Sequence, residues 1–321
     1  MATISGVSNW RLIVQRHTTG ITILRAVTCD RCATLPDTLF DLPVTALGDH
    51  AFAGGTVSGE EVCITCGPSD GEWDNRKLQE LTLPKYITKI DNYAFLNCRA
   101  LRTLQLYDAV QHWGVGAVMN CQSLRRILLT RLDAQQGETL AYLAGELSRE
   151  LDVSIFDTDG SQTRLLFPEY METYEENSPA HHFDYVIYGA GHPYHHVFRG
   201  KTLHLADFDA LWTRFLAVEH DEAAALQLSW WRLRFPQALD NAARAAYERY
   251  LRTHSTEALS FALTQQDLSG LRQLLPLLSE TPEAISHALS LARQQRNTEA
   301  IAILLEQQHR THRGDDKTFD L

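Results

Sequence analysis

Apolar residues recur along the first third of the chain with a period longer than that of a helix or a strand. Two stretches, 78–100 and 101–123, align without a gap. Leu78 and Leu101 begin these stretches, and Leu124 follows at the same spacing. Each stretch begins L-x-x-L-x-L, whose alternating apolar positions predict a short strand with one buried face. The later apolar positions of each stretch predict a second buried segment, the return leg, which leads the chain back to the start of the next strand. Because one such coil cannot bury its own face, we expect the coils to stack into a solenoid.

A less regular unit, 35–55, precedes the two matching stretches. Its Val44, Leu47, Ala51 and Phe52 take the places of the apolar return-leg residues of the later units. The sequence therefore predicts at least three stacked coils.

An Asn-Cys pair recurs at the same place, as Asn97-Cys98 and Asn120-Cys121. Asn suits a turn because its side chain satisfies backbone groups, and a small thiol packs inside. Over about 35–130 the units resemble the BspA-like class of leucine-rich repeats, whose unit reads roughly LxxLxLPxxVxxIxxxAFxxCxxL. The resemblance implies a curved solenoid with a parallel sheet on one face. In that class the usual role is protein recognition, and many members sit on cell surfaces.

The strand residues that point outward are the candidate contact surface of such a solenoid. The alternative is that they are solvated positions of a structural cap. The residues we assign to this predicted surface are Gln79, Glu80, Arg102, Gln105, Arg125 and Arg126.

The middle of the chain, 132–205, contains three predicted segments. Helical spacing over 132–151 predicts a helix that closes the open end of the solenoid. Apolar runs on either side of a turn at Asp159 predict a β-hairpin over 153–170. Several Pro and Gly residues make 171–205 an irregular connector that folds against its neighbours.

From 206 onward the apolar spacing is helical. Two successive stretches, 255–278 and 281–306, each predict a helix pair, with Ala258-Leu259 placed opposite Ala284-Ile285. The pairs have a loose resemblance to ankyrin-type helix pairs, without their β-turn and T-P-L-H signature.

The composition of the chain limits the classes of partner that it can bind. The 321 residues are 44% hydrophobic and 21% charged, which is ordinary for a globular protein. The net charge of −11 argues against nucleic acid and against an anionic membrane surface, and favours basic partners at most. We see neither a signal peptide nor an apolar run of membrane-spanning length. The expectation is a cytoplasmic protein with reduced cysteines.

Two CxxC pairs carry the sharpest candidate chemistry: Cys29 with Cys32, and Cys63 with Cys66. Four thiolates in two pairs suit a tetrahedral structural zinc ion. The stretch between the pairs, 33–62, is longer than the usual spacing and holds a repeat-like unit. The alternative interpretation places the first pair at a turn and Cys63 in a separate short strand.

Six histidines gather in the connector: His181, His182, His192, His195, His196 and His204. They could supply metal ligands or a general base. Their spacing matches no metal motif, and the interleaved Tyr and Phe favour a packed connector. The sequence has no GxxxxGK[ST] phosphate loop and no GxSxG elbow, so no catalytic residue is assigned.

The sequence thus predicts an α+β chain in which a short leucine-rich repeat solenoid precedes a mostly α-helical domain of stacked helix pairs. We expect a repeat domain at 1–131, a mixed connector at 132–205 and a helical domain at 206–321. The favoured function is a non-enzymatic scaffold or adaptor that binds another protein and needs no cofactor. The alternatives are a zinc-stabilised regulatory module and, less favoured, a metal-dependent enzyme that uses the His-rich connector.

Overall fold

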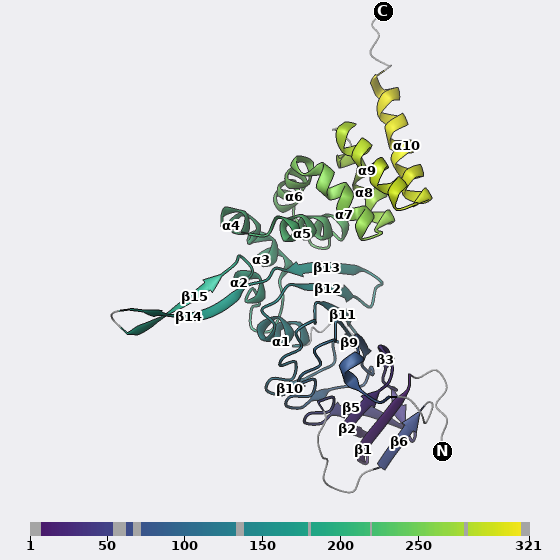
Figure 1. The fold of residues 1–321 in the computed structure, drawn as a ribbon, viewed down its shortest axis with the longest axis vertical. Helices are drawn as coiled ribbons and strands as arrows, with labels where there is room; N and C mark the ends of the chain where they lie inside the picture. Colours follow the sequence, from purple (N-terminus) through teal and green to yellow (C-terminus); the bar gives the residue numbers. More distant parts are fainter. Residues whose placement is uncertain are drawn as a thin grey trace, which may run out of the picture. The chain divides into compact units, whose positions relative to one another are not determined.

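The computed structural model divides the chain into two compact units, Met1–Phe208 and Asp209–Leu321. The first is built mainly of stacked coils and the second of helices (Figure 1). The structure describes residues 8–53, 62–66, 72–132, 138–178, 181–218, 220–278 and 282–315.

One long side of the coils in the first unit forms a sheet with the strand order β13-β12-β11-β9-β7-β3. Strands β3 to β12 run parallel, and β13 returns antiparallel to β12. The strands of this sheet, sheet B, are β3 (Cys32–Thr34), β7 (Glu80–Thr82), β9 (Thr103–Tyr107), β11 (Arg126–Thr130), β12 (Leu151–Phe156) and β13 (Gln162–Phe167). Leu81, Leu104 and Ile127 pair in register and are buried, as the repeat period predicts.

The return legs, with β1 and β6 added beside them by antiparallel pairing, form a second sheet, sheet A, with the order β10-β8-β5-β2-β1-β6 and with β4 paired to β5. Its strands are β1 (Trp10–Arg16), β2 (Ile21–Thr28), β4 (Thr38–Leu39), β5 (Leu42–Leu47), β6 (Val62–Cys66), β8 (Lys89–Ile90) and β10 (His112–Trp113). A short 3₁₀ helix, η1 (Asn75–Lys77), precedes β7. Ile90, Phe95 and Leu104 are fully buried, so the coils bury apolar residues from both legs.

The predicted Asn-Cys turns are confirmed. Asn97 and Asn120 have φ angles of 62° and 60°, in the left-handed region that Asn tolerates better than most residues. The amides of Cys98 and Cys121 close these turns on Phe95 and Val118. Both thiols are buried.

The predicted helix over 132–151 is shorter in the structure and does not end the array. Helix α1 (Thr139–Glu146) packs on the preceding return leg, where the Tyr142 hydroxyl donates to the carbonyl of Gly114 at 2.8 Å. Strand β12 then adds another parallel strand to sheet B. The hairpin predicted over 153–170 is confirmed as β12 and β13, and β13 is the last strand of the sheet.

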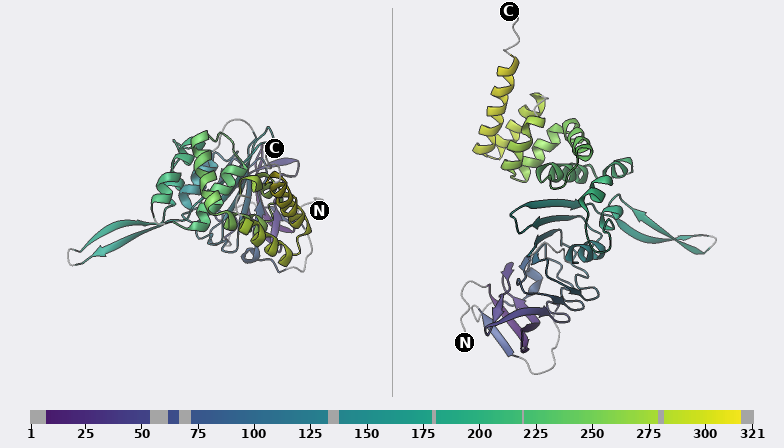
Figure 2. Two further views of the ribbon diagram at one scale, coloured as in Figure 1. Left: turned by 90° about the horizontal axis from the view of Figure 1, so that it is seen from above. Right: turned by 180° about the vertical axis from the view of Figure 1, so that it is seen from behind.

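The prediction that 171–205 is irregular is wrong for its first half. Strands β14 (Met171–Asn177) and β15 (His182–Tyr188) form an antiparallel hairpin that projects from the first unit (Figures 1 and 2). Its sequence does not alternate between apolar and polar residues, because both faces of this hairpin carry apolar and acidic residues. The short helix α2 (His192–His195) and a β-bridge at Arg199 and Thr202 follow.

Helices build the second unit, and the predicted fold class is confirmed. The boundary between the units falls within α3 (Leu205–Ala210). The later helices are α4 (Trp212–Ala217), α5 (Glu222–Arg234), α6 (Asn241–Thr253), α7 (Ser255–Thr264), α8 (Leu268–Leu278), α9 (Pro282–Gln294) and α10 (Thr298–Asp315). Along the parts of the chain that the structure describes, no helix is both long and apolar enough to cross a membrane.

A buried ion pair lies in the core of the helical unit. The Arg232 guanidinium donates to both carboxylate oxygens of Asp209, at 2.7 and 2.8 Å. It also donates to the carbonyls of Phe235 and Gln237, and the Tyr247 hydroxyl donates to Asp209 at 2.9 Å. Arg232 is fully buried, so these bonds replace the water that the two charges lose.

The helix pairs α7–α8 and α9–α10 correspond through the turns that join their helices. The amide of Asp267 donates to Ala262, and that of Asn297 donates to Ala292, both at 2.9 Å. The same two side chains accept from the amides of Gly270 and Ala300. When these turns are aligned, Ala258 of the first pair corresponds to Ala288 of the second rather than to Ala284. The predicted alignment of the first helices was therefore one helical turn out of register. The ankyrin-like character of the pairs stays a prediction.

Candidate protein-binding surfaces

Sheet B presents rows of side chains that run across neighbouring strands. The pairing places Cys32, Glu80, Thr103, Arg126 and Asp152 in one row. Side chains alternate along a strand, and the residues between those of the rows, such as Leu104 and Ile127, point into the core. The residues of the second row are Thr34, Thr82, Gln105, Leu128, Ser154 and Arg164. The residues of the third row are Tyr107, Thr130, Phe156 and Gln162.

Three of the residues predicted to bind a partner lie on these rows. Glu80 and Arg126 are exposed at one end of the face, and Gln105 is half-buried in the middle of β9. The remaining three, Gln79, Arg102 and Arg125, lie just before the strands. Of these, Arg102 is exposed and the other two are half-buried.

Backbone hydrogen bonds fix those three residues along one rim of the sheet. The carbonyl of Gln79 accepts from the amides of Arg102 and Thr103, at 2.7 and 3.0 Å. The carbonyl of Arg102 accepts in the same way from the next coil, at 3.1 and 3.0 Å. Because this rim repeats from coil to coil, Arg102 and Arg125 occupy equivalent positions in successive coils.

The same face carries an aromatic and apolar strip, whose aromatic residues the sequence prediction did not include. Tyr107, Thr130 and Phe156 share a row, and Phe156 is 38% exposed. Leu128 lies in the neighbouring row. The alternation of buried Leu151, Val153 and Ile155 is the signal that places Phe156 on the outer face of this strand.

The charges on sheet B are of both signs. Arg164 of β13 pairs with Asp152 of β12, with Nε 2.7 Å from the carboxylate. The side chains of this pair are 19% and 13% exposed, so water screens it less than an exposed pair. Together with Glu80 and Arg126, these residues give the face a mixed pattern rather than a single sign of charge.

The four cysteines predicted to bind zinc lie on three different segments of the repeat unit, because Cys63 and Cys66 share β6. Cys29 follows β2, Cys32 begins β3 of sheet B, and Cys63 lies in β6, which β1 separates from β2. Two strand spacings amount to about 9.6 Å. Thiolates that share one zinc ion lie within about 4 Å of one another, because each Zn–S bond is about 2.3 Å long.

Within β6, Cys66 and Cys63 pair with Trp10 and Ile13, three positions apart along an extended strand. No group of three or more metal-ligating side chains gathers among the described residues. The thiol pKa of Cys32 is raised by desolvation and by the neighbouring Glu80 carboxylate. No observation favours the zinc hypothesis, which stays a prediction.

The histidines of the connector lie in different surroundings. His195 is buried, and its ring nitrogens lie 2.8 and 2.9 Å from the carbonyls of Ala144 and Pro168. Burial lowers the pKa of His195, and the carbonyl contacts partly oppose this. The ring ties α1 to the segment after β13, which is a structural role.

The rings of His192 and His196 stack on each other, with centroids 4.1 Å apart. His181 directly precedes β15 and His182 begins it, and exposed carboxylates contact them at 2.9 and 3.4 Å. His204 is exposed before α3. These positions do not bring the six rings together.

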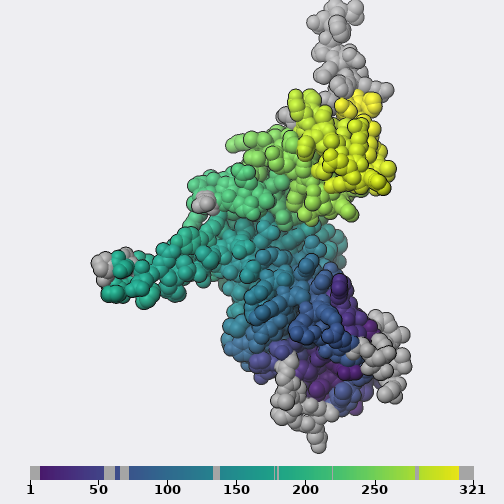
Figure 3. All heavy atoms as spheres, viewed as in Figure 1, coloured from purple at the N-terminus to yellow at the C-terminus, as the bar shows by residue number. Residues whose placement is uncertain are grey.

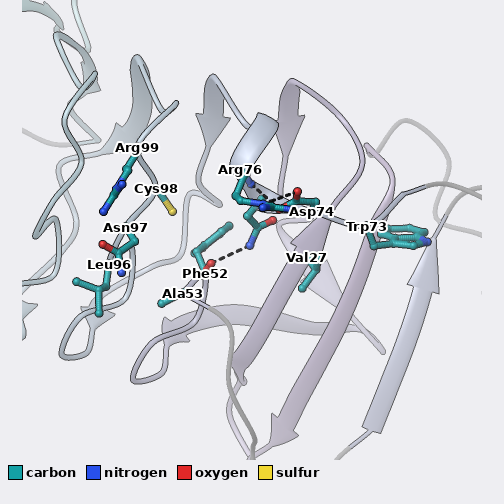
Figure 4. Close-up of a pocket in the computed structure, with 11 residues that line it drawn as sticks. Val27, Phe52, Ala53, Trp73, Asp74, Arg76, Leu96, Asn97, Cys98 and Arg99 are labelled. Atoms are coloured by element: carbon teal, nitrogen blue, oxygen red, sulfur yellow. Dashed lines mark hydrogen bonds and ion pairs between the residues drawn. The ribbon is translucent and has the colours of Figure 1, made fainter.

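A cavity of about 660 Å³ opens beside the first coils (Figure 4). No histidine is among the described residues that line this cavity. The Asn75 side chain donates to the carbonyls of Ala26 and Phe52, and Asp74 pairs with Arg76 at 2.7 Å. Burial raises the pKa of the Cys98 thiol, so this thiol is a poor nucleophile. Residues around the cavity are Val27, Phe52, Ala53, Trp73, Asp74, Asn75, Arg76, Leu96, Asn97, Cys98 and Arg99.

One comparison with known proteins supports the repeat. A family model described as a BspA type leucine-rich repeat region, of six copies, matches residues 69–139. A crystal structure of a leucine-rich repeat protein of T. pallidum is 18% identical over 40% of this chain and 72% of that chain. Its TM-score is 0.22, which is too low to bear on the architecture. A search of curated proteins found no significant match.

The even spacing of Leu78, Leu101 and Leu124, the stacked parallel strands and the Asn-Cys turns all lie within the matched residues. The first unit of this chain therefore contains a BspA-type leucine-rich repeat region.

Proposed function

We propose that the protein is a non-enzymatic interaction scaffold that binds a partner protein through the face of sheet B. The observation that carries the proposal is the register of the parallel strands. It keeps apolar residues inside the coils and leaves rows of charged, polar and aromatic side chains outside. Solenoids bind through such extended rows because neighbouring coils present equivalent positions.

The centre of the proposed contact is the strip of Leu128, Tyr107 and Phe156, with Arg102 and Arg126 on its flank. Interface centres are enriched in aromatic and apolar side chains, and Arg is enriched among interface residues. Charged residues at the edge select the partner through complementary potential rather than through raw affinity. The mixed signs on this face therefore favour a partner protein over a uniformly charged polymer.

The experiment that tests the proposal is affinity capture with quantitative mass spectrometry, comparing three forms of the full chain. These are the wild type, the face variant Arg102→Glu/Arg126→Glu, and the control variant Lys85→Glu/Lys89→Glu. The control has the same change in charge, but its residues lie outside sheet B.

We expect the face variant to lose specific partners at least tenfold. Carboxylates that a partner places opposite Arg102 and Arg126 would then face glutamates, and like charges across an interface cost several kcal/mol. The control should retain them. Equal recovery with all three forms would rule out this face as the main contact. Thermal unfolding of each form separates loss of binding from loss of folding.

A further inference from the structure

The β14–β15 hairpin carries a concentration of exposed apolar side chains. We call it the hairpin arm and define it as Met171–Asn177 and His182–Tyr188. Of the fourteen large hydrophobic residues that are exposed in the described chain, six lie on the arm: Met171, Tyr174, Phe183, Tyr185, Ile187 and Tyr188. Tyr174 and Phe183 are 69% and 66% exposed. Concentrations of exposed apolar surface mark interaction sites.

The arm stands away from the sheets of its own unit (Figures 1 and 3). Among the described residues, β14 and β15 pair only with each other. A hairpin with two free edges and two open faces is marginally stable alone in water. Its free edges can also pair with an added strand.

Strand register sorts the side chains of the arm onto two faces. Tyr174 pairs with Tyr185, and their ring centroids lie 5.3 Å apart. Because residues alternate along each strand, the face that holds this pair can be listed. The residues of this tyrosine face are Glu172, Tyr174, Glu176, Phe183, Tyr185 and Ile187.

The charge of the arm is of one sign. No Lys or Arg occurs between Arg164 and Arg199, whereas this stretch contains five acidic residues. On the tyrosine face, Glu172 and Glu176 lie on either side of Tyr174 along β14. They are four positions apart, which corresponds to about 13 Å along a strand.

Contacts within the arm place carboxylates beside aromatic rings. The Tyr185 hydroxyl donates to Glu172, which raises the pKa of Tyr185 to about 12. On the other face the Tyr188 hydroxyl donates to Glu175. Glu172 also lies 3.5 Å from the ring of His192, and Glu176 lies 2.9 Å from that of His181.

We propose that the tyrosine face of the hairpin arm binds an extended basic segment of another protein, with arginines at alternate positions. In such a segment the outer two arginines lie opposite Glu172 and Glu176, and the middle one lies over the tyrosine rings. A guanidinium gains both from a carboxylate and from an aromatic face, and it is more weakly hydrated than an ammonium.

The charge of the arm selects this occupant over a second copy of the chain. Two arms that meet face to face would bring their glutamates together, and each chain already carries a net charge of −11. A basic segment relieves that repulsion and covers the exposed rings. This contact is separate from sheet B, so the proposal does not depend on the function assigned to that sheet.

Fluorescence anisotropy with labelled peptides tests the proposal on the full chain. The probe is Thr-Arg-Thr-Arg-Thr-Arg-Thr, and its control is Thr-Thr-Arg-Arg-Arg-Thr-Thr, which has the same composition without the alternate spacing. We expect the alternating peptide to bind more tightly by several-fold, because only its arginines reach one face of the arm.

Two variants locate the binding on the arm. Tyr174→Ser/Tyr185→Ser removes the rings, and Glu172→Gln/Glu176→Gln keeps the side-chain shape while removing two charges. Each is expected to weaken binding by about tenfold. The glutamine variant should also flatten the salt dependence. Its control is Glu299→Gln/Glu306→Gln in the helical unit, which removes the same charge and should bind like the wild type.

Circular dichroism checks that each variant remains folded. If the serine variant loses the hairpin, the peptide affinity of the glutamine variant alone tests the proposal. Equal affinity for both peptides, or unchanged binding by the glutamine variant, would overturn the proposal. Sedimentation gives one more decisive outcome. A dimer that Tyr174→Ser/Tyr185→Ser dissociates would show that a second copy covers the arm instead of a basic segment.

Discussion

The two units of this chain reach a packed core in different ways. In the repeat unit each coil contributes equivalent apolar residues, such as Leu81, Leu104 and Ile127, that stack on the same residues of the next coil. In the helical unit one fully buried ion pair, Arg232 with Asp209, joins α5 to the end of α3. The first arrangement depends on repetition and the second on a single set of partners.

This difference has a consequence for substitutions. When one residue of the apolar ladder is truncated, its coil loses the packing of the removed atoms. The other coils keep their own contacts, because each coil touches only its neighbours. A buried charge that loses its partner keeps its full desolvation penalty. The helical unit should therefore be the more sensitive of the two to one polar substitution.

The largest expected effect is that of Asp209→Asn. It leaves the Arg232 guanidinium buried without a counter-charge, and such losses cost about 3–5 kcal/mol. Hydrogen exchange measured by mass spectrometry reports the stability of each unit separately, and protection should fall in α5 and α6.

The matched control is Glu248→Gln, which breaks an i,i+4 pair with Arg252 on the partly exposed side of α6. This change should cost less than about 0.5 kcal/mol. If Asp209→Asn cost as little as the control, the proposed contrast between the units would be wrong.

A smaller effect is expected for Leu104→Ala in the centre of the ladder. Leu104 is fully buried, and truncation of a buried leucine costs about 2–5 kcal/mol, with about 3 expected here. Exchange should increase mainly in β7, β9 and β11. The comparison variant is Leu128→Ala, whose side chain is half-buried on the outer face and should cost about 1 kcal/mol or less. Loss of protection along every coil at once would contradict the nearest-neighbour picture.

Effects smaller than that of Leu104→Ala come from a pair of glycines and should differ in sign. A Cβ atom at Gly114 would lie 2.3 Å from the backbone nitrogen of Asn92, so Gly114→Ala forces adjacent coils apart. It should cost about 1–3 kcal/mol. Gly145 of α1 has open space at this position, and Gly145→Ala should stabilise by about 0.5–1 kcal/mol. Denaturant unfolding of the two variants gives the sign directly, and destabilisation by both would show that the space at Gly145 does not decide the outcome.

The repeat was predictable because buried apolar residues recur at a fixed spacing between segments that are neighbours in the sequence. Leu78, Leu101 and Leu124 indicate the coil spacing, and the alternation after each of them fixes which side chains point inward. The helical nature of the second unit followed from the same kind of local periodicity. The candidate site was predicted only in part: Glu80, Gln105 and Arg126 lie on the rows of sheet B, whereas Phe156 was missed because its strand follows a helix rather than a repeat.

The sequence by itself determined the spacing of the coils, the inward residues and the order of strands followed by helices, since each depends on residues close along the chain. Only the tertiary structure decided which distant residues meet. It placed β1 between β2 and β6 and so separated Cys29 from Cys63, it joined Arg232 to Asp209, and it left the tyrosine face of the hairpin arm open. Local periodicity records which side of a strand is buried, but the neighbour that buries it depends on the path of the whole chain.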